Sequence, residues 1–529
     1  MSSGTDLDLI RRELASDAGQ LKPLGLGRVV AGPGAVDRLA EVVLPGGPTP
    51  ATGRPGPRVA TVVVLAAATA MAMDGRDLRA AVEQALDRDF AVDWVTIGPD
   101  DGQVHADEAT VAAATAAAAG AGCVVTVGSG TITDIGKAAA PAAARLVTVQ
   151  TATSVNGYAD PFSVLLRHGV KRTTPSRWPD ALVIDPAVLQ DAPPDLNRAG
   201  AGDLMAMFTA PADWYLATAL ARSGSGTPAG DPPYHPTVAG LVRARGARLL
   251  ELAATAFPPT PSVTPSAPPP SPGQDPCGSR SAGLGDRGSR PPAGVGGGSR
   301  PGAELAGQRS GALAELAGIL TLSGIGMGVA GSTAPASGLE HAVSHLLEMA
   351  ATARGEPGSF HGTQVGVASV VAARTWAHVL GRIADGGLGR PAARPDPDGV
   401  SARIGRAFAA IDPSGAMAAE CFADYAKKLR RLGSDPLAAL RVSWPDHIEV
   451  LTGILTEPDA ITSALRTAGL PARFCDLPEP VDDETARWAV ATSPLMRQRI
   501  CVADLAMLLG AWEDADVDTV LAGTTGGQR

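Results

Sequence analysis

Aromatic side chains are scarce in this chain of 529 residues, where Phe, Trp and Tyr together make up 4% of the sequence. Alanine is abundant instead, and this composition favours closely packed helices over a β-sandwich. Cysteine is also rare, and the five cysteines lie far apart with no Cys-x-x-Cys pair: Cys123, Cys277, Cys421, Cys475 and Cys501. Their spacing excludes a disulfide framework and a zinc knuckle, and it is typical of a reducing cytosol.

Positive charge is in deficit, with 44 Lys and Arg against 54 Asp and Glu and a net charge of −10. This balance argues against binding to nucleic acid or to an anionic membrane. The first 25 residues contain no apolar segment typical of a signal peptide. The apolar runs Val59–Met73 and Val111–Val127 are too short or too interrupted to span a bilayer. We therefore expect a soluble cytoplasmic protein.

Short β-branched runs alternate with helical patterns in the first part of the chain. The predicted strands are Arg28–Val30, Val59–Ala66, Ala91–Ile97, Cys123–Val127 and Leu146–Gln150. The predicted helices are Ala35–Val43, Asp74–Arg88 and Asp107–Ala119. This alternation predicts a parallel sheet covered by helices on both faces. Val164–Lys171 and Ala181–Ile184 are expected to form a hairpin and an edge strand, respectively.

The pattern changes near Asn197, after which Ala- and Leu-rich helical periods continue to Trp512. Between Pro258 and Pro301, 28 of 44 residues are Pro, Gly or Ser. Such a segment buries too little apolar surface to offset the entropy lost on ordering, so we expect it to be disordered.

The stretch Ala121–Lys137 combines a buried strand, a turn containing Gly128 and Gly130, and the start of a helix. Thr131 or Thr133 is expected to cap that helix. Backbone N–H groups and the positive end of the helix dipole would then meet at one point, which suits a phosphate or pyrophosphate. The alternative is a tight strand–helix connection without a ligand, since the spacing differs from G-x-G-x-x-G.

Three of the eight histidines, His341, His345 and His361, fall within 21 residues. His341 and His345 are four residues apart and share one helical face. Imidazoles from adjacent helices are suitable ligands for zinc or a similar divalent ion, and Asp203 is the best upstream carboxylate to complete a site. The alternative is a set of surface or core histidines that bind no metal.

Six motifs occur in one order along the chain: Gly128-Ser-Gly-Thr-Ile-Thr-Asp134, Thr151-Ala-Thr-Ser154, Lys171-Arg-Thr-Thr-Pro-Ser-Arg177, Gly200-Ala-Gly-Asp203, Ser337-Gly-Leu-Glu-His341-x-x-x-His345 and His361-Gly-x-x-Val-Gly366. Together they resemble the sn-glycerol-1-phosphate dehydrogenases. These belong to the superfamily of iron-containing alcohol dehydrogenases, glycerol dehydrogenases and dehydroquinate synthases. The resemblance spans roughly residues 26 to 512, apart from the Pro/Gly/Ser-rich insert.

The resemblance implies a dehydroquinate synthase-like fold, in which a Rossmann-like α/β domain precedes an all-α domain. The implied segments are an extension (1–25), a nucleotide-binding domain (26–196), a helical metal and substrate domain (197–512, with insert 258–301) and a tail (513–529). The activity implied is metal-dependent, NAD(P)-linked interconversion of a small hydroxylated ketone, phosphorylated or not, and its alcohol.

The resemblance also assigns site residues. Asp203, His341 and His361 match metal ligands, and His345 matches a histidine that contacts the substrate and relays the alcohol proton. The expected cofactor contacts are Gly128, Ser129, Gly130, Thr131, Ile132, Asp134, Thr151, Ser154 and Asp160. Zinc is the first choice of metal, with iron or nickel as alternatives. Either NAD or NADP could be the cofactor, because Leu65–Ala68 contains no acidic residue of the kind that often hydrogen-bonds the ribose 2′-hydroxyl of NAD.

Two positions depart from the family pattern. Asn156 stands where the family has a substrate-contacting Asp, and Asp160 stands where a cofactor-contacting Ser is usual. Asn156 keeps hydrogen-bonding capacity but removes a charge beside the metal. We therefore predict a native substrate other than dihydroxyacetone phosphate, with a larger or more anionic carbonyl compound favoured.

Two other functions remain as alternatives. One is an NAD-dependent cyclase or lyase of the dehydroquinate synthase type, for which Lys171, Arg172 and Arg177 are the only obvious basic cluster. The other is a catalytically altered homologue that binds but does not turn over. A small-molecule substrate is the expected partner, and a homo-oligomer is left open.

Overall fold

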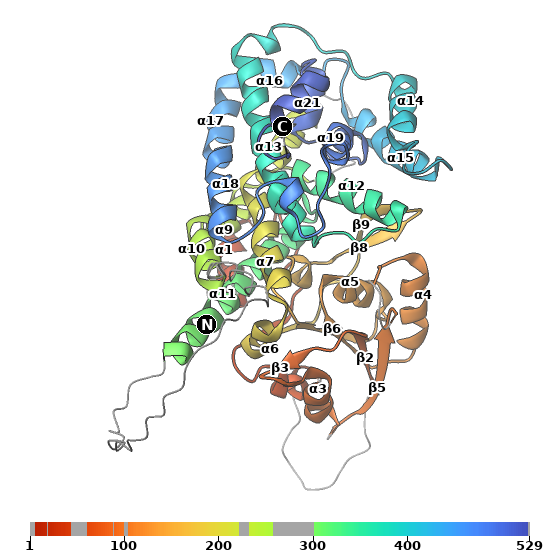
Figure 1. Cartoon of the computed structure of the whole chain (residues 1–529), viewed down its shortest axis with the longest axis vertical. Coiled ribbons are helices and arrows are strands. Elements are labelled where there is room, and N and C mark those ends of the chain that lie inside the picture. The colour runs from red at the N-terminus through yellow and green to blue at the C-terminus, as the bar shows by residue number, and fades with distance from the viewer. Residues whose placement is uncertain are drawn as a thin grey trace, which may run out of the picture.

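The computed structural model describes residues 6–17, 19–43, 61–87, 89–99, 104–221, 232–257 and 301–526 (Figure 1). An α/β part contains the parallel sheet, and a helical part contains most of the second half of the chain. The predicted disordered insert lies outside the described residues, except for Pro301, at which a helix begins.

The sheet of the α/β part has six strands in the order β1-β10-β7-β6-β2-β5, and every pairing is parallel. These strands are β1 (Arg28–Ala31), β2 (Thr61–Ala67), β5 (Ala91–Ile97), β6 (Cys123–Gly128), β7 (Arg145–Gln150) and β10 (Ala181–Ile184). The predicted edge position of Ala181–Ile184 is wrong, because β10 pairs with both β1 and β7 and all four of its residues are buried. Its unbroken apolar sequence is typical of such a central strand.

Both faces of the sheet are covered, as the strand pattern predicted. Val62 and Val64 of β2 pack in one apolar cluster with α3 (Leu78–Leu86). Val63 and Leu65 pack in another with α4 (Glu108–Ala117) and α5 (Gly130–Ala139). The alternation follows from the two-residue period of a strand. Helix α2 (Leu39–Val43) also belongs to these layers.

The expected helix Asp74–Arg88 begins later than predicted. Residues before it form a two-stranded antiparallel ribbon of β3 (Ala72–Met73) and β4 (Arg76–Asp77), which turns at Asp74 and Gly75 with φ of 53° and 70°. The Asp77 carboxylate then accepts from the backbone N–H of Arg79 and caps α3. Positive φ is rare outside glycine and ends a helical run, so the ribbon replaces the first turn.

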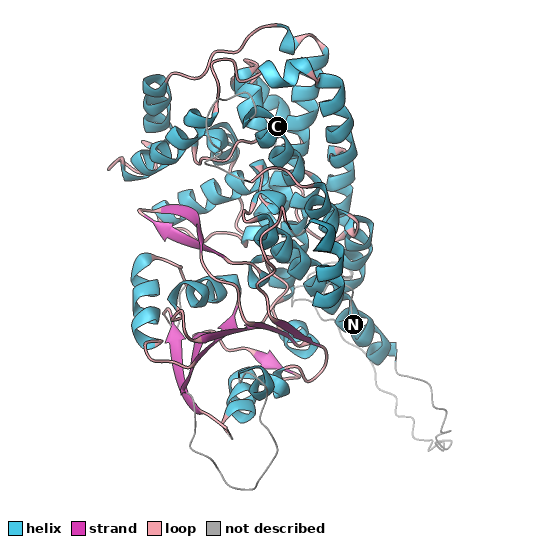
Figure 2. Ribbon diagram, turned by 180° about the vertical axis from the view of Figure 1, so that it is seen from behind, coloured by secondary structure: helices cyan, strands magenta, loops and turns pink. Residues whose placement is uncertain are grey.

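The predicted hairpin is confirmed and connects the two parts of the chain. Strand β8 (Phe162–Arg167) pairs with β9 (Val170–Pro175), and the pair extends from the sheet toward the helices (Figure 2). Near the turn, Leu166 N–H donates to Ala106 O at 2.9 Å. At its tip, Val170 is fully buried in the core of the helical part.

The helical part is built around α11 (Pro301–Ala330), α12 (Leu339–Arg354) and α13 (His361–Ala384). By length and composition alone, Gly307–Ala330 could cross a membrane, but 89% of its most apolar window is buried inside the protein. The surrounding helices are α6 (Pro186–Asp191), α7 (Pro194–Asp203), α8 (Ala210–Ala221), α9 (Pro236–Arg243), α10 (Gly246–Ala256), α14 (Pro397–Phe408), α15 (Ala416–Arg431), α16 (Ala438–Val442), α17 (Trp444–Ile454), α18 (Pro458–Thr467), α19 (Asp483–Thr492), α20 (Val502–Leu508) and α21 (Asp514–Leu521).

The two ends of the described chain also pack on this part. Helix α1 (Leu7–Leu14) buries Leu7, Ile10 and Leu14 in its core. Helix α21 buries Val517, Val520 and Leu521 in a second cluster.

Candidate active site

A cleft of about 510 Å³ lies between the α/β part and the helical part. Most of the predicted site residues line it: Ser129, Gly130, Thr131, Ile132, Asp134, Ser154, Asn156, Asp160, Asp203, His341, His345 and His361. Gly128 and Thr151 are not among the described residues that line the cleft. A volume of this size is typical of a small-molecule or cofactor site.

One wall of the cleft is the N-terminus of α5. Strand β6 ends at Gly128, Ser129 is the N-cap, and α5 begins at Gly130. The predicted capping by Thr131 or Thr133 is wrong, because the helix begins before both, and the Thr133 hydroxyl donates back to Ser129 O at 3.3 Å. The amide groups at residues 129–132 and the helix dipole still favour an anion at this wall.

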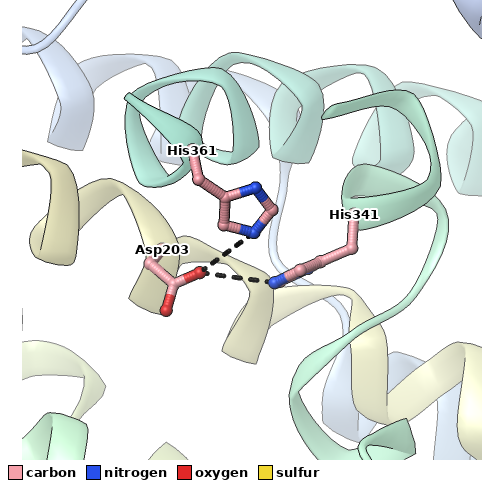
Figure 3. Close-up of side chains that lie close together, drawn as sticks. All are labelled: Asp203, His341 and His361. Atoms are coloured by element: carbon pink, nitrogen blue, oxygen red, sulfur yellow. Dashed lines mark ion pairs between the residues drawn. The ribbon is translucent and has the colours of Figure 1, made fainter. Parts of the chain in front are cut away.

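The opposite wall brings together one carboxylate and two imidazoles from three helices. Asp203 is the last residue of α7, His341 lies in the first turn of α12, and His361 is the first residue of α13 (Figure 3). Asp203 Oδ1 lies 3.3 Å from His341 Nε2 and 4.0 Å from His361 Nε2. One ligand atom from each residue lies within 4.8 Å of the others, an arrangement that can hold one metal ion.

Close packing of α7 against α13 places Asp203 beside His361. A Cβ added to Gly202 would lie 2.3 Å from Gly362 O, and a Cβ added to Gly362 would lie 1.9 Å from Ala199 O. Only glycine allows the two backbones to approach this closely. The glycines therefore set the separation of the two candidate ligands that adjoin them.

Each imidazole makes a hydrogen bond with a carboxylate through its other ring nitrogen. His341 Nδ1 lies 3.1 Å from Glu340 Oε1, and His361 Nδ1 lies 2.6 Å from Glu348 Oε1. With the Nδ1–H of each ring donating to its carboxylate, both Nε2 lone pairs face Asp203. Sequence reasoning missed both glutamates, although Glu348 lies seven residues after His341, two helical turns along the same face.

The Asp203 carboxylate is itself buried, with 1% of the residue exposed. Its Oδ2 accepts from the backbone N–H of Asn156 at 3.0 Å, whereas its buried Oδ1 has no hydrogen-bond partner among the described residues. An unsatisfied buried carboxylate oxygen is costly unless a cation or donor satisfies it. These residues therefore fit a divalent ion placed between Asp203 Oδ1 and the two Nε2 atoms.

The protonation state of His361 agrees with this fit. Burial, together with the nearby positive charge of His341, lowers the pKa of His361 to about 3, so its imidazole is neutral at neutral pH. Burial alone would lower the pKa of His341 as well, but the neighbouring carboxylates of Asp203 and Glu340 raise it above its usual value.

His345 lies one helical turn after His341 and faces the same space. Its ring centroid is 6.3 Å from that of His341 and 5.3 Å from that of His361. Burial lowers the pKa of His345 well below its usual value, and nearby positive charges, including those of Lys171 and Arg497, lower it further. A neutral imidazole therefore stands beside the three candidate ligands.

The two departures from the family pattern occupy different surroundings. The Asn156 amide donates to Ser323 Oγ at 3.1 Å. Asp160 is 3% exposed, and its Oδ1 accepts from Lys137 Nζ at 2.9 Å and from Phe162 N–H at 2.8 Å. Burial raises the pKa of Asp160 to about 6, against the opposing effect of Lys137. The Asp160 carboxylate is thus held by the Lys137 ammonium and by the backbone of Phe162.

Asp134 and Ser154 also have defined contacts. Asp134 Oδ1 lies 3.1 Å from Lys137 Nζ, so this buried lysine lies between two carboxylates. The Ser154 hydroxyl lies 3.1 Å from the Tyr158 hydroxyl. The predicted contacts of Asp134, Ser154 and Asp160 with a cofactor stay predictions.

Solved structures of other proteins share this two-domain fold. Among solved structures, a probable glycerol dehydrogenase from Sinorhizobium meliloti 1021 aligns with a TM-score of 0.52, at 16% identity, covering 95% of this chain and 98% of the other. The NADH-dependent butanol dehydrogenase A of Thermotoga maritima aligns with a TM-score of 0.50, at 14% identity, covering 95% and 97%. At these identities the alignments establish the fold, and the predicted two-domain architecture is confirmed.

Sequence comparison agrees with the resemblance seen in the motifs. The model of the family described as iron-containing alcohol dehydrogenase matches residues 57–193. The glycerol-1-phosphate dehydrogenase [NAD(P)+] of Methanothrix thermoacetophila is 27% identical over 225 residues, 42% of this chain and 46% of that protein. The protein of the same name from Aeropyrum pernix is 28% identical over 263 residues, 49% and 57% of the two chains. The chain thus spans about half the length of these curated relatives, and its resemblance to this superfamily is confirmed.

Proposed function

We propose that this chain is a metal-dependent, NAD(P)-linked oxidoreductase that interconverts a small hydroxylated ketone and its alcohol. The observation that carries the proposal is the position of Asp203, His341 and His361 across one cleft from the N-terminus of α5. The same cleft thus offers a candidate divalent-ion site and a candidate anion site. The names of the relatives support the same activity.

In this proposal, one wall of the cleft would hold the metal ion and the other would hold the cofactor. A bound divalent ion would act as a Lewis acid on the carbonyl oxygen, and a bound nicotinamide would supply the hydride. The N-terminus of α5 would hold the pyrophosphate through its backbone N–H groups. Glu340 and Glu348 hold the two imidazoles in the tautomer that leaves Nε2 facing the metal site. Zinc is the first choice for a site of two imidazoles and one carboxylate.

His345 would exchange the proton of the alcohol oxygen. Its imidazole is neutral at neutral pH, so it can accept that proton when the alcohol is oxidised. In the reverse direction, the same nitrogen returns the proton to the oxygen. Burial limits competition from bulk water, since 4% of the residue is exposed.

The cyclase alternative has less support. Of its candidate basic cluster, only Lys171 lines the cleft. Arg172 contacts Glu420 and Asp424 at 3.2 and 3.6 Å, and Arg177 contacts Asp180 at 3.0 Å. These two arginines are thus paired away from the cleft.

We further propose that the binding partner is a small molecule and that the protein binds neither nucleic acid nor a membrane. We also propose that the protein is cytoplasmic. The test is a screen of hydroxylated ketones with metal-loaded protein and either NADH or NADPH, followed by nicotinamide absorbance. A steady absorbance decrease supports the oxidoreductase. Product formation without net nicotinamide change supports the cyclase, and cofactor binding without any turnover supports the altered homologue.

A further inference from the structure

Asp213 is a buried carboxylate at the start of α8, with 1% of the residue exposed. It is not among the described residues that line the cleft. Its two oxygens accept hydrogen bonds from three other helices. Oδ2 accepts from the backbone N–H of Leu339 at 2.8 Å, whereas Oδ1 accepts from Val502 N–H at 3.0 Å and from the Trp376 indole N–H at 3.1 Å. One side chain of α8 therefore joins α12, α13 and α20.

Two of these contacts satisfy groups that a helix leaves unpaired. Leu339 is the first residue of α12, and Val502 is the first residue of α20. The first four N–H groups of a helix have no partner within it, so a buried helix N-terminus needs an acceptor from elsewhere. A carboxylate suits this place because its charge also interacts favourably with the positive end of the helix dipole. Asp213 thus fixes the point at which α12 begins.

The position of α12 bears directly on the candidate metal site. His341 is the third residue of this helix, two positions after Leu339. Trp376 belongs to α13, whose first residue is His361. Asp213 therefore contacts both of the helices that carry the candidate imidazole ligands.

A second contact joins α12 to the start of α8. The Thr209 hydroxyl, just before α8, donates to Glu340 Oε2 at 3.0 Å, and Glu340 is the carboxylate that holds His341 Nδ1. The residue before α12 is Gly338, where an added Cβ would lie 2.6 Å from Asp213 Oδ2. The absence of a side chain there leaves room for the carboxylate to reach α12.

We infer that Asp213 is a positioning residue of the metal site: it holds the first turn of α12 in place against α13, so that His341 and His361 keep the separation that one divalent ion requires. The inference rests on the proposed function, which uses that ion. Asp213 touches neither ion nor substrate, and it acts through the backbone of α12 and the indole of α13. Groups that orient ligands from outside the coordination shell alter metal affinity without being ligands themselves.

The test compares Asp213→Asn with a matched control, Asp185→Asn. Asparagine keeps the shape of the side chain, but its nitrogen donates where a carboxylate oxygen accepted, so it cannot accept at both positions. Asp185 is also 1% exposed, and its oxygens accept from Val36 N–H at 3.2 Å and from Ala187 N–H at 3.1 Å in the α/β part. Each variant loses a buried partner for backbone N–H groups, but only Asp213 contacts α12 and α13.

Zinc affinity is measured by competition with a chelator, and cobalt(II) in place of zinc gives a visible spectrum that reports ligand geometry. Asp213→Asn should bind zinc roughly 10-fold more weakly or worse and should change the cobalt spectrum. Asp185→Asn should keep the wild-type spectrum and stay within about 3-fold of the wild-type zinc affinity, because distant sites act independently. Both variants should lower the melting temperature, so a merely structural role predicts the same zinc affinity for both.

A milder variant decides the question if Asp213→Asn does not fold. Trp376→Phe removes the indole donor and leaves both backbone bonds of Asp213 in place. Its control is Trp512→Phe, since Trp512 is 3% exposed and donates its indole N–H to Ala491 O at 3.3 Å. Trp376→Phe should weaken zinc binding roughly 3- to 10-fold relative to this control, less than the loss of the whole carboxylate.

Equal zinc affinities in each variant and its control, with the wild-type cobalt spectrum in all of them, would overturn the inference. Wild-type protein that binds no zinc would overturn it as well. If the zinc and cobalt changes occur but wild type turns over no ketone in the screen, the positioning role stands and the proposed oxidoreductase activity fails.

Discussion

The backbone contact between α7 and α13 gives a sharp prediction, because it sets the spacing of two candidate ligands. In Gly202→Ala, the new methyl carbon would lie 2.3 Å from Gly362 O, whereas ordinary contacts begin at 3.4 Å. The obstacle is backbone, so the helices must separate by about 1 Å. Asp203 and His361 directly adjoin the two glycines and would move apart with them.

Overpacking of this kind costs roughly 1–3 kcal/mol of unfolding free energy. At roughly 2–4 °C per kcal/mol for large domains, the melting temperature should fall by several degrees. Zinc affinity should fall roughly 10-fold or more, because a metal site tolerates little displacement of its ligands. Calorimetry of unfolding and zinc titration of the purified variant measure the two effects.

Gly405→Ala is the matched control, since Gly405 is an exposed helical glycine of α14 with no atom within 4 Å of an added Cβ. This substitution should leave zinc affinity unchanged and stabilise the chain by roughly 0.5–1 kcal/mol, because alanine loses less entropy in a helix. If Gly202→Ala matched the control in melting temperature and zinc affinity, the glycine contact would not determine the site.

Three further predictions concern the site. Asp203→Ala and His361→Ala should each lose both zinc and turnover, whereas His345→Ala should keep zinc and lower kcat; metal analysis and steady-state kinetics measure this, and full zinc in an active His361→Ala protein would contradict the ligand set. Chelation should lower the melting temperature and zinc should restore it, because a ligand that binds only the folded state stabilises it by mass action; identical unfolding curves with and without chelator would exclude a bound metal. Asn156→Asp combined with Asp160→Ser should raise kcat/KM for dihydroxyacetone phosphate over wild type; a wild-type value already near ~10⁴ M⁻¹s⁻¹ or above would show that the two departures do not alter substrate choice.

Much of the fold could be predicted from local sequence. The β-branched run before Gly128 is long enough for one buried strand. In the structure this run forms β6, and all six residues of β6 are buried. The order of the strands in the sheet could not be predicted in the same way, because it does not depend on any local sequence pattern. Strand β10 has the same apolar character wherever it pairs, and its place between β1 and β7 follows from the crossover connections.

The candidate metal site was partly visible in the sequence. His341 and His345 fall on one face by helical spacing, and glycines beside Asp203 indicated close packing. The contacts of Asp160 with Lys137 and of Lys171 with Glu348 join residues 23 and 177 positions apart. Such pairs depend on how the hairpin and the helices meet across the cleft, which periodicity does not encode.

Zinc titration of the metal-free protein tests the central claim most directly, with the rate of NADH or NADPH oxidation followed in the presence of the best ketone from the screen. The rate should rise linearly with zinc and reach its plateau at one equivalent per chain, and the same titration of His361→Ala should give no rate. Full activity in the metal-free protein, or a plateau in His361→Ala equal to that of wild type, would contradict the account.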